Sequence, residues 1–308
     1  MQKSKTELTA IIATANRPDI LKRTLESIAN QSVQPSEILI IDGSTDNCTK
    51  EISNLFYINL DSRILHYTAI DIGAAIQREQ GMRHNKSNFI LFLDDDIILF
   101  EECLKTMFER INSDERVGGI NAMIVNQKYL KPSLLSKTLF RFMHGKKENS
   151  YAGKCIGPAL NLLPEDKTEL PDFVEVEWLN STCTLYRKEA LPSPVFDSFF
   201  YGYSIMEDLT LSLKVGKNWK LLNSRNSKIF HDSQQGSHKN NLRELSKMAL
   251  VNRHYVMVTI LKRIRFYDFI KLYLLELILL ITSQNKFNKN VWVGKFDGIK
   301  EIIRNERV

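Results

Sequence analysis

Three consecutive carboxylates, Asp94, Asp95 and Asp96, are the residues whose types and spacing point most directly to chemistry. They follow the apolar residues 89–93 without a break. Three adjacent like charges are unfavourable unless water or a cation neutralises them. Carboxylate oxygens are hard ligands, and such a cluster suits Mg²⁺ or Mn²⁺ shared with a substrate phosphate. The triplet therefore indicates a metal site or, taken out of context, a solvated acidic turn.

Other candidates for nucleotide binding follow neighbouring predicted strands. The apolar residues 89–93 have the composition of a strand buried on both faces, as in a parallel α/β sheet. Ligands bind at the carboxyl ends of such strands, so groups that follow several strands converge. The guanidinium of Arg78 can pair with a diphosphate through its planar fork, or it is an ordinary surface arginine. Besides the triplet, these groups are Asn16 and Arg17 after strand 8–13, Asp42 after strand 37–41, and Asp71 and Arg78 after strand 64–67.

Two carboxylates and a histidine further along the chain are candidates for catalysis and metal binding. Glu207 and Asp208 open the apolar-periodic segment 207–215, which predicts a helix. Acidic residues there either stabilise the helix N-terminus or supply a general base aimed at a substrate hydroxyl. His231 follows an apolar strand, and its imidazole either completes a metal site with Asp96 or serves as a structural hydrogen-bonding group.

A tryptophan, Trp178, precedes a polar loop that contains Asn180 and Ser181 and lies between two predicted strands. Its indole ring either stacks on a sugar ring or packs in the core.

The elements that must position these residues alternate between strands and helices, which indicates a doubly wound sheet. Residues 126–172 break the pattern with prolines and glycines and are interpreted as an insertion over the sheet edge. The predicted strands are 8–13, 37–41, 64–67, 89–93, 118–125, 175–178, 183–186 and 220–222, and the predicted helices are 20–28, 73–85, 101–112, 207–215 and 241–262.

The composition is that of a globular protein with a sizeable core. The chain has 308 residues, 43% of them hydrophobic, and a net charge of +6 carried by basic residues spread along the sequence, which argues against nucleic acid as a partner. Four cysteines without a Cys-x-x-Cys pair indicate reduced thiols and no zinc site. Residues 1–7 lack an apolar signal core, and no apolar run reaches the roughly 18 residues that span a bilayer. We therefore expect a cytoplasmic protein.

The tail combines basic, aromatic and apolar residues. Lys262, Arg263, Arg265 and Lys271 flank the apolar residues 272–281. Such a segment can lie flat on an anionic bilayer, or it forms a helix that packs on the domain or on a second subunit. The sequence leaves both alternatives open.

The order of these motifs resembles that of the family 2 glycosyltransferases with the GT-A fold. The resemblance covers about residues 8–255. It depends on Thr-x-Asn-Arg-Pro at 14–18, Asp-Gly-Ser-Thr-Asp at 42–46, Asp-Ile-Gly-x-x-x-x-Arg at 71–78, Phe-Leu-Asp-Asp-Asp at 92–96, Trp-x-x-Ser at 178–181, Leu-Tyr-Arg-Lys-Glu-Ala-Leu at 185–191, Glu-Asp-Leu at 207–209 and the histidine at 231.

The resemblance implies a GT-A-like doubly wound mixed sheet with helices on both faces. It implies a catalytic domain 1–240, with a nucleotide-binding half 1–125 and an acceptor half 126–240, followed by a C-terminal helical region 241–308. Site roles come from the same resemblance. The implied groups are Thr14, Asn16, Arg17, Asp42, Asp71, Arg78, Asp94 and Asp95 for the nucleotide-sugar; Asp94, Asp96 and His231 for Mn²⁺ or Mg²⁺; Asp208 as catalytic base, supported by Glu207; and Trp178, Asn180 and Ser181 for the acceptor.

The implied activity is inverting, metal-dependent transfer of one sugar from a UDP- or dTDP-sugar to a hydroxyl of a glycan or lipid-linked glycan, in surface polysaccharide or glycoconjugate synthesis. The expected location is the cytoplasm, either free or peripheral on the inner face of the membrane, and a homo-oligomer is left open. Two departures from the family pattern are Ile41 before a single Asp42, and Glu79 after Arg78. The Gln-x-x-Arg-Trp motif of processive synthases is absent, which favours single-sugar transfer.

Two alternatives belong to other classes. A sugar nucleotidyltransferase needs a glycine-rich phosphate loop after its first strand, and residues 14–18 contain no glycine. A non-catalytic carbohydrate- or membrane-binding protein on a transferase fold is disfavoured because both Asp96 and Asp208 are present.

Overall fold

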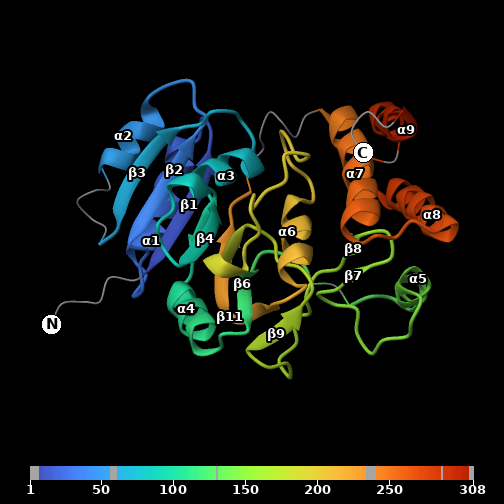
Figure 1. Cartoon of the computed structure of the whole chain (residues 1–308), viewed down its shortest axis with the longest axis horizontal. Coiled ribbons are helices and arrows are strands. Elements are labelled where there is room, and N and C mark those ends of the chain that lie inside the picture. The colour runs from blue at the N-terminus through green and yellow to red at the C-terminus, as the bar shows by residue number, and fades with distance from the viewer. Residues whose placement is uncertain (1–6, 56–60, 130, 234–240, 286, 305–308) are drawn as a thin grey trace.

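The computed structural model describes residues 7–55, 61–129, 131–233, 241–285 and 287–304. Residues 1–6 lie outside these ranges. The predicted domain boundary after residue 240 lies at the start of the range 241–285. Figure 1 shows a central sheet with helices on its two faces and a group of C-terminal helices at one end.

Four parallel strands form the N-terminal half of a nine-stranded sheet, in the order β3-β2-β1-β4. Their register places Asp94 opposite Ala13, and Asp42 opposite Thr14. The polar residues that follow these strands therefore meet at one sheet edge, as predicted. The strands are β1 (Leu8–Thr14), β2 (Glu37–Asp42), β3 (Arg63–Thr68) and β4 (Phe89–Asp94).

The other half of the sheet is mixed. The strand after β4 in the sheet, β10, runs antiparallel to both of its neighbours, β4 and β6. The longest strand, β11, pairs with β6 in parallel and with β5 and β9 in antiparallel fashion. These strands are β5 (Ile97–Leu99), β6 (Val117–Ile124), β9 (Phe173–Val176), β10 (Cys183–Arg187) and β11 (Lys220–His231).

The sequence predicted two short strands where β11 is continuous. Its pairing with β6 shifts between Ser224 and Lys228, so a bulge interrupts the alternation of side chains. The hydroxyl of Ser224 donates to Ser227, and the backbone N–H of Ser227 donates back to Ser224. The bulge is therefore closed by its own side chains.

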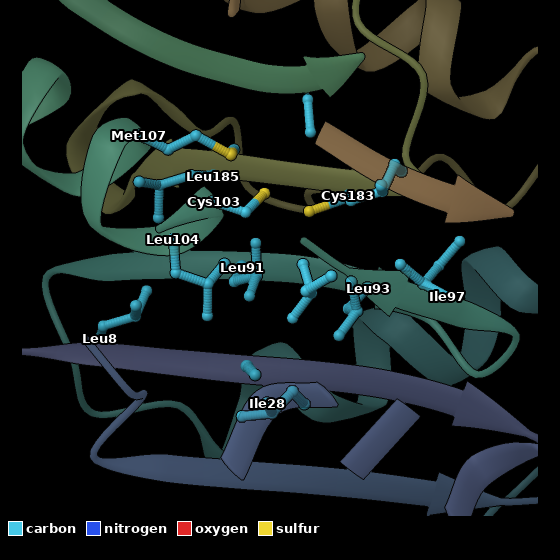
Figure 2. Packing of buried hydrophobic residues seen from close by; sticks show 14 of the residues in the cluster. Leu8, Ile28, Leu91, Leu93, Ile97, Cys103, Leu104, Met107, Cys183 and Leu185 are labelled. Atoms are coloured by element: carbon cyan, nitrogen blue, oxygen red, sulfur yellow. The ribbon is translucent and has the colours of Figure 1, made fainter. Parts of the chain in front are cut away.

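Both faces of the sheet are covered because the central strands are apolar on both sides. Leu91 and Leu93 of β4 pack on one face, and Ile90 and Phe92 pack on the other. Figure 2 shows Leu91 near Leu104 and Leu93 near Ile97, with the sulfurs of the buried Cys103 and Cys183 facing each other above them. All four cysteines are free thiols, as predicted. The helices are α1 (Pro18–Ala29), α2 (Cys48–Leu55) and α4 (Cys103–Ser113), and, on the opposite face, α3 (Ala74–His84) and α6 (Glu207–Val215).

The insertion at 126–172 has more regular structure than the sequence predicted. It contains the helix α5 (Leu134–His144) and a two-stranded hairpin of β7 (Cys155–Ile156) and β8 (Leu160–Asn161). The helix is capped by the Ser133 hydroxyl, which accepts the Ser136 N–H.

The C-terminal region forms three helices that pack against the sheet domain and against one another. Glu276 is buried in α8, where it accepts a hydrogen bond from Arg253 of α7 at 2.8 Å and is paired with Lys295 of α9. None of the helices in the described ranges has the length and hydropathy that crossing a bilayer requires. The helices are α7 (Leu242–Tyr255), continued by a π-helical turn at Val256–Ile260, α8 (Phe266–Thr282) and α9 (Lys289–Arg304).

Candidate functional site

Strand pairing brings three predicted metal ligands together. The chain turns after β4 and returns as β5, whose Ile97 pairs with His231 at the end of β11. This register places the imidazole next to Asp96, with Nε2 of His231 at 3.2 Å from Oδ1 of Asp96. One ligand atom from each of Asp94, Asp96 and His231 lies within 4.8 Å of the others. Two carboxylates and an imidazole are a donor set that fits Mn²⁺ and, with fewer protein ligands, Mg²⁺.

The backbone around His231 is fixed by a residue that the sequence did not single out. The side chain of Asn126 donates to the carbonyl of His231 at 2.8 Å and accepts the N–H of His231 at 3.1 Å. The N–H of Asp232 donates to the carbonyl of Asp96 at 2.9 Å. These hydrogen bonds fix the backbone at His231 without a bound ligand.

The middle carboxylate of the triplet, Asp95, has a different environment. It is buried and accepts a hydrogen bond from the Thr14 hydroxyl at 2.6 Å, and it pairs with the guanidinium of Arg17 at 2.6 Å. Burial raises the pKa of Asp95 to about 7, and the Arg17 charge opposes this rise. Arg17 also reaches Asp96 at 3.3 Å. Thr14 and Arg17, expected near the nucleoside, therefore join the loop after β1 to the acidic triplet.

Arg78 links the metal cluster to the second acidic motif. Its side chain is almost fully buried and contacts Asp94, the Ser181 hydroxyl at 2.9 Å and the Glu207 carboxyl at 3.3 Å. The triplet after β4 and the acids that open α6 therefore lie at one site, because a single guanidinium touches both. In this arrangement the planar fork of Arg78 is bound to protein groups.

The two acids at the start of α6 differ in their proton affinity. Burial and the neighbouring Asp208 charge raise the pKa of Glu207 to about 8, against the effect of Arg78. Burial raises the pKa of Asp208 to about 6. Both carboxyls therefore hold protons more tightly than exposed acids do, and the coupled pair can share one proton near neutral pH. A pair that shares one proton provides one carboxylate that can accept another proton.

The loop before α6 is positioned by elements from both halves of the chain. The side chain of Asn252 in α7 donates to the carbonyl of Ile205 at 2.7 Å. Gly73, at the start of α3, forms a bridge with Gly202. A Cβ on Gly73 would lie 2.8 Å from the Gly202 carbonyl oxygen, and its φ of +153° is one that side chains rarely adopt. Asn252 was not predicted from the sequence, because an asparagine inside a helical pattern has no distinctive spacing.

At the ends of β1 and β2, a hydrogen-bond network fixes the predicted nucleoside side of the site. The buried carboxylate of Asp42 accepts hydrogen bonds from Ser44 and lies 2.9 Å from Nε2 of His66. The side-chain oxygen of Asn16 accepts the N–H of Thr45 at 3.1 Å. His66 was not recognised in the sequence, because its link to Asp42 depends on the pairing of β2 with β3.

Three other predicted residues have contrasting surroundings. Trp178 is in the core, and its indole N–H donates to the Leu162 carbonyl at 2.7 Å, so the core alternative describes its ring. Asn180 has a buried side-chain oxygen without a hydrogen-bond partner, next to the loop residue that contacts Arg78. Asp71 is exposed and accepts a local hydrogen bond from the Ile72 N–H at 2.8 Å.

A cavity of about 1090 Å³ lies within the insertion, against α5. Its lining includes Tyr129, Phe140 and Tyr151, and no predicted metal or catalytic residue. Its basic side chains are Lys128, Lys131, Lys137, Arg141, Lys147 and Lys167. The cavity is thus distinct from the cluster at Asp94, Asp96 and His231.

Known proteins of one family share this sequence pattern. The family described as "Glycosyl transferase family 2" matches residues 9–191, which is more than half of the chain. A GalNAc(5)-diNAcBac-PP-undecaprenol beta-1,3-glucosyltransferase of Campylobacter jejuni is 24% identical over 198 residues, covering 64% of this chain and 56% of its own length. Glycosyltransferase GlyA of Streptococcus pneumoniae is 29% identical over 117 residues, 37% of this chain and 16% of GlyA. The chain therefore spans about half of the first relative and a smaller part of the second.

Solved structures share the fold. The mannosyltransferase PcManGT from Pyrobaculum calidifontis, in complex with GDP-Man and Mn²⁺, has a TM-score of 0.57 at 13% identity, covering 98% of this chain and 76% of PcManGT. A fragment of TarS from S. aureus, in complex with UDP-GlcNAc, has a TM-score of 0.56 at 14% identity, covering 95% of this chain and 80% of the fragment. This likeness confirms the predicted GT-A-like α/β fold. The sequence match over residues 9–191, more than half of the chain, shows that the chain belongs to glycosyl transferase family 2.

Proposed function

We propose that this enzyme is an inverting, metal-dependent transferase that moves one sugar from a nucleotide-sugar to a hydroxyl of a glycan or lipid-linked glycan at the inner face of the membrane. The observation that carries the proposal is the position of Arg78, which touches Asp94 of the metal cluster and Glu207 of the acid pair. A cation site and a proton acceptor next to one another are the two parts that this reaction needs.

Asp94, Asp96 and His231 would hold Mn²⁺ or Mg²⁺, and the bound cation supplies a Lewis acid for the leaving nucleoside diphosphate. Asp208 takes the proton from the acceptor hydroxyl. The acceptor oxygen then bonds to the anomeric carbon from the face opposite the diphosphate, and the bond to the diphosphate breaks with inversion. Glu207 stays in contact with Arg78 and supports Asp208 from the neighbouring position.

For the donor, we propose a UDP- or dTDP-sugar that lies across the ends of β1, β2 and β4. The support is the network that fixes Asn16 and Asp42 there, together with Thr14, Arg17 and Asp95. Asp71 is kept as a donor contact because it is exposed at the same edge of the sheet. The solved neighbours carry UDP-GlcNAc and GDP-Man, so both kinds of base belong in a donor screen.

For the acceptor, we propose a lipid-linked glycan of a surface polysaccharide or glycoconjugate pathway. The named Campylobacter relative acts on a PP-undecaprenol compound, which supports this class of acceptor. The support from this chain is Ser181, which contacts Arg78, and the preceding residue Asn180, whose buried side-chain oxygen has no hydrogen-bond partner. The ring of Trp178 is not part of the proposal, because it is buried in the core.

The test is a melting-temperature screen with UDP, dTDP and GDP, each with and without Mn²⁺, followed by hydrolysis of the matching nucleotide-sugars. A ligand that binds the native state raises the melting temperature by mass action. We expect one nucleoside diphosphate to do so only with Mn²⁺, and Asp96→Asn to abolish the Mn²⁺-dependent part.

The matched control is Asp114→Asn, because Asp114 precedes β6 and so lies at the opposite, amino-terminal edge of the sheet. This variant should retain the shift. If none of the three nucleotides stabilises the wild-type protein and none of the nucleotide-sugars is hydrolysed, the proposal is wrong.

A further inference from the structure

The helix α8 is apolar on both sides, although only one side packs against the protein. Leu272 is buried in a C-terminal cluster with residues of α7 and α9, Leu275 is buried in a cluster with Met143 of α5, and Leu280 is also buried. A helix that is apolar all round is expected to be covered all round. The opposite side of α8 is nevertheless exposed, so it lacks an apolar partner among the residues that the structure describes.

The exposed apolar residues of α8 recur every three or four positions and so form one stripe along the helix. They are aromatic or branched aliphatic, and no charged residue interrupts them. Their exposed fractions are 81% for Phe266, 49% for Ile270, 39% for Tyr273, 37% for Leu274, 46% for Leu277 and 53% for Ile281.

Helix α5 extends this stripe. The ammonium group of Lys271 in α8 donates to the Met143 carbonyl at 3.0 Å and lies 5.4 Å from the ring of Phe142. Phe142 and Leu135 of α5 are exposed by 49% and 81%. Figure 1 shows α5 and α8 at the same end of the molecule, far from α2 and β3. We name the α8 stripe with Phe142 and Leu135 the α5–α8 face.

The segments that carry this face are strongly basic. Residues 131–147 contain five Lys or Arg and no Asp or Glu, and residues 262–271 contain four Lys or Arg and the single acid Asp268. Asp268 caps its own helix by accepting the Arg265 N–H at 3.0 Å. Long basic side chains beside apolar surface can bury their stems while their charged ends reach phosphates. The partner of this face should therefore be apolar inside and anionic at its surface.

We infer that the α5–α8 face binds the surface of a bilayer that contains anionic lipids, with the α8 stripe at the boundary of headgroups and acyl chains. A second copy of the chain fits less well, because a two-fold contact through this face would oppose like charges. The inference rests on the proposed location at the inner face of the membrane and names the α5–α8 face as the surface that makes the contact. It does not depend on the donor or the acceptor.

The test measures binding of the full chain to sedimented vesicles of phosphatidylcholine, with and without added phosphatidylglycerol. The wild-type protein should bind only the vesicles with phosphatidylglycerol. The double variant Ile270→Glu/Leu277→Glu should bind at least roughly tenfold more weakly, because two apolar side chains no longer leave water. The matched control is Leu55→Glu in α2, an exposed apolar residue at the other end of the molecule, which should bind like the wild type.

The charge contribution is tested with Lys262→Gln and Arg265→Gln, which are both exposed. Each should weaken binding to the anionic vesicles by roughly fivefold, the effect of one basic residue near an anionic surface. The melting temperature and the nucleotide-sugar hydrolysis of all variants should match the wild type. A variant that loses hydrolysis but still binds vesicles would concern the proposed reaction and not this surface.

Four results would overturn the inference. They are no binding of the wild type to anionic vesicles; equal binding to neutral vesicles; wild-type binding by the Ile270→Glu/Leu277→Glu variant; and a concentration-dependent dimer that this variant disrupts while vesicles are not bound. The last result would identify a second copy as the partner.

Discussion

Replacing Asp208 with asparagine is the most direct test of the proposed chemistry. Asparagine has the same shape, and its side-chain oxygen can still accept the Leu209 N–H that Asp208 accepts at 2.7 Å. The start of α6 should therefore remain intact, while the group that takes the proton is lost. A positioned general base contributes about 10²–10⁴ in rate, which corresponds to about 3–5 kcal/mol of activation free energy.

The pH dependence of the wild-type rate gives a second measurement of the same group. Asp208 works only when it is ionised, and its pKa is raised to about 6. Activity should therefore be present above pH 6 and lost as the pH falls through that value, with about a tenfold decrease between pH 7 and pH 5. The Asp208→Asn enzyme should have a low rate without this decrease.

The assay is the initial rate of nucleotide-sugar hydrolysis or transfer with saturating Mn²⁺, and binding of the nucleoside diphosphate is followed in parallel. Binding should survive in Asp208→Asn. The matched control is Asp268→Asn, which also changes an aspartate that accepts a backbone N–H in the first turn of a helix, at the start of α8. A rate for Asp208→Asn above about a tenth of wild type, or an unchanged pH profile, would refute the assignment.

Three further changes test the metal site, the loop before α6 and the core. His231→Gln should weaken Mn²⁺ binding, measured by calorimetry, by at least about tenfold. Mutation of a residue that only hydrogen-bonds a metal ligand already lowers metal affinity by about that factor, and unchanged affinity would show that His231 is not a ligand. Asn252→Ala should lower kcat more than it raises the KM for the donor, because the Ile205 carbonyl loses its donor, and equal kcat values would contradict this. Leu91 of β4 is fully buried, so Leu91→Ala should lower the free energy of unfolding, measured in urea, by about 2–5 kcal/mol. A smaller change would mean that neighbouring side chains fill the space that the leucine leaves.

The parallel half of the fold was predictable because each strand is a short apolar run that ends at a polar residue. Asp42 and Asp94 both follow such runs, and the structure aligns them at one edge. The helix with Glu207 at its start was predicted with the bounds that the structure has, because its apolar period and its acidic first turn agree. The sequence also predicted Asp94, Asp96 and His231 as candidate metal ligands, and the structure brings these three side chains together.

The features of the fold and the site that could not be predicted from the sequence depend on contacts between distant segments. The strand β5 has only three residues, and it exists because it pairs with β11. The link of His66 to Asp42 requires the register of two neighbouring strands. Trp178 is compatible with either a sugar surface or the core from its neighbours alone, and only packing decides.

The C-terminal region shows the same limit in another form. One side of α8 packs on the domain, as one of the two alternatives predicted, and the other side is exposed, where binding to a bilayer stays a prediction. Because the residues of α8 are apolar on all sides, the sequence does not indicate which side of the helix packs on the domain and which side is exposed. The buried Glu276, which joins α7, α8 and α9, identifies the packed side only once its partners Arg253 and Lys295 are known.

The bulge at 224–227 is a position in β11 where the chain can be lengthened without a change in the pairing of the residues that follow, including His231. Beyond it, three successive rungs with β5 fix which way each side chain points. An engineer who lengthens the chain at Arg225 or Asn226 should leave the imidazole where it is. One residue added between Lys228 and His231 should instead turn the imidazole to the other side of the sheet and remove it from the candidate metal site at Asp94 and Asp96.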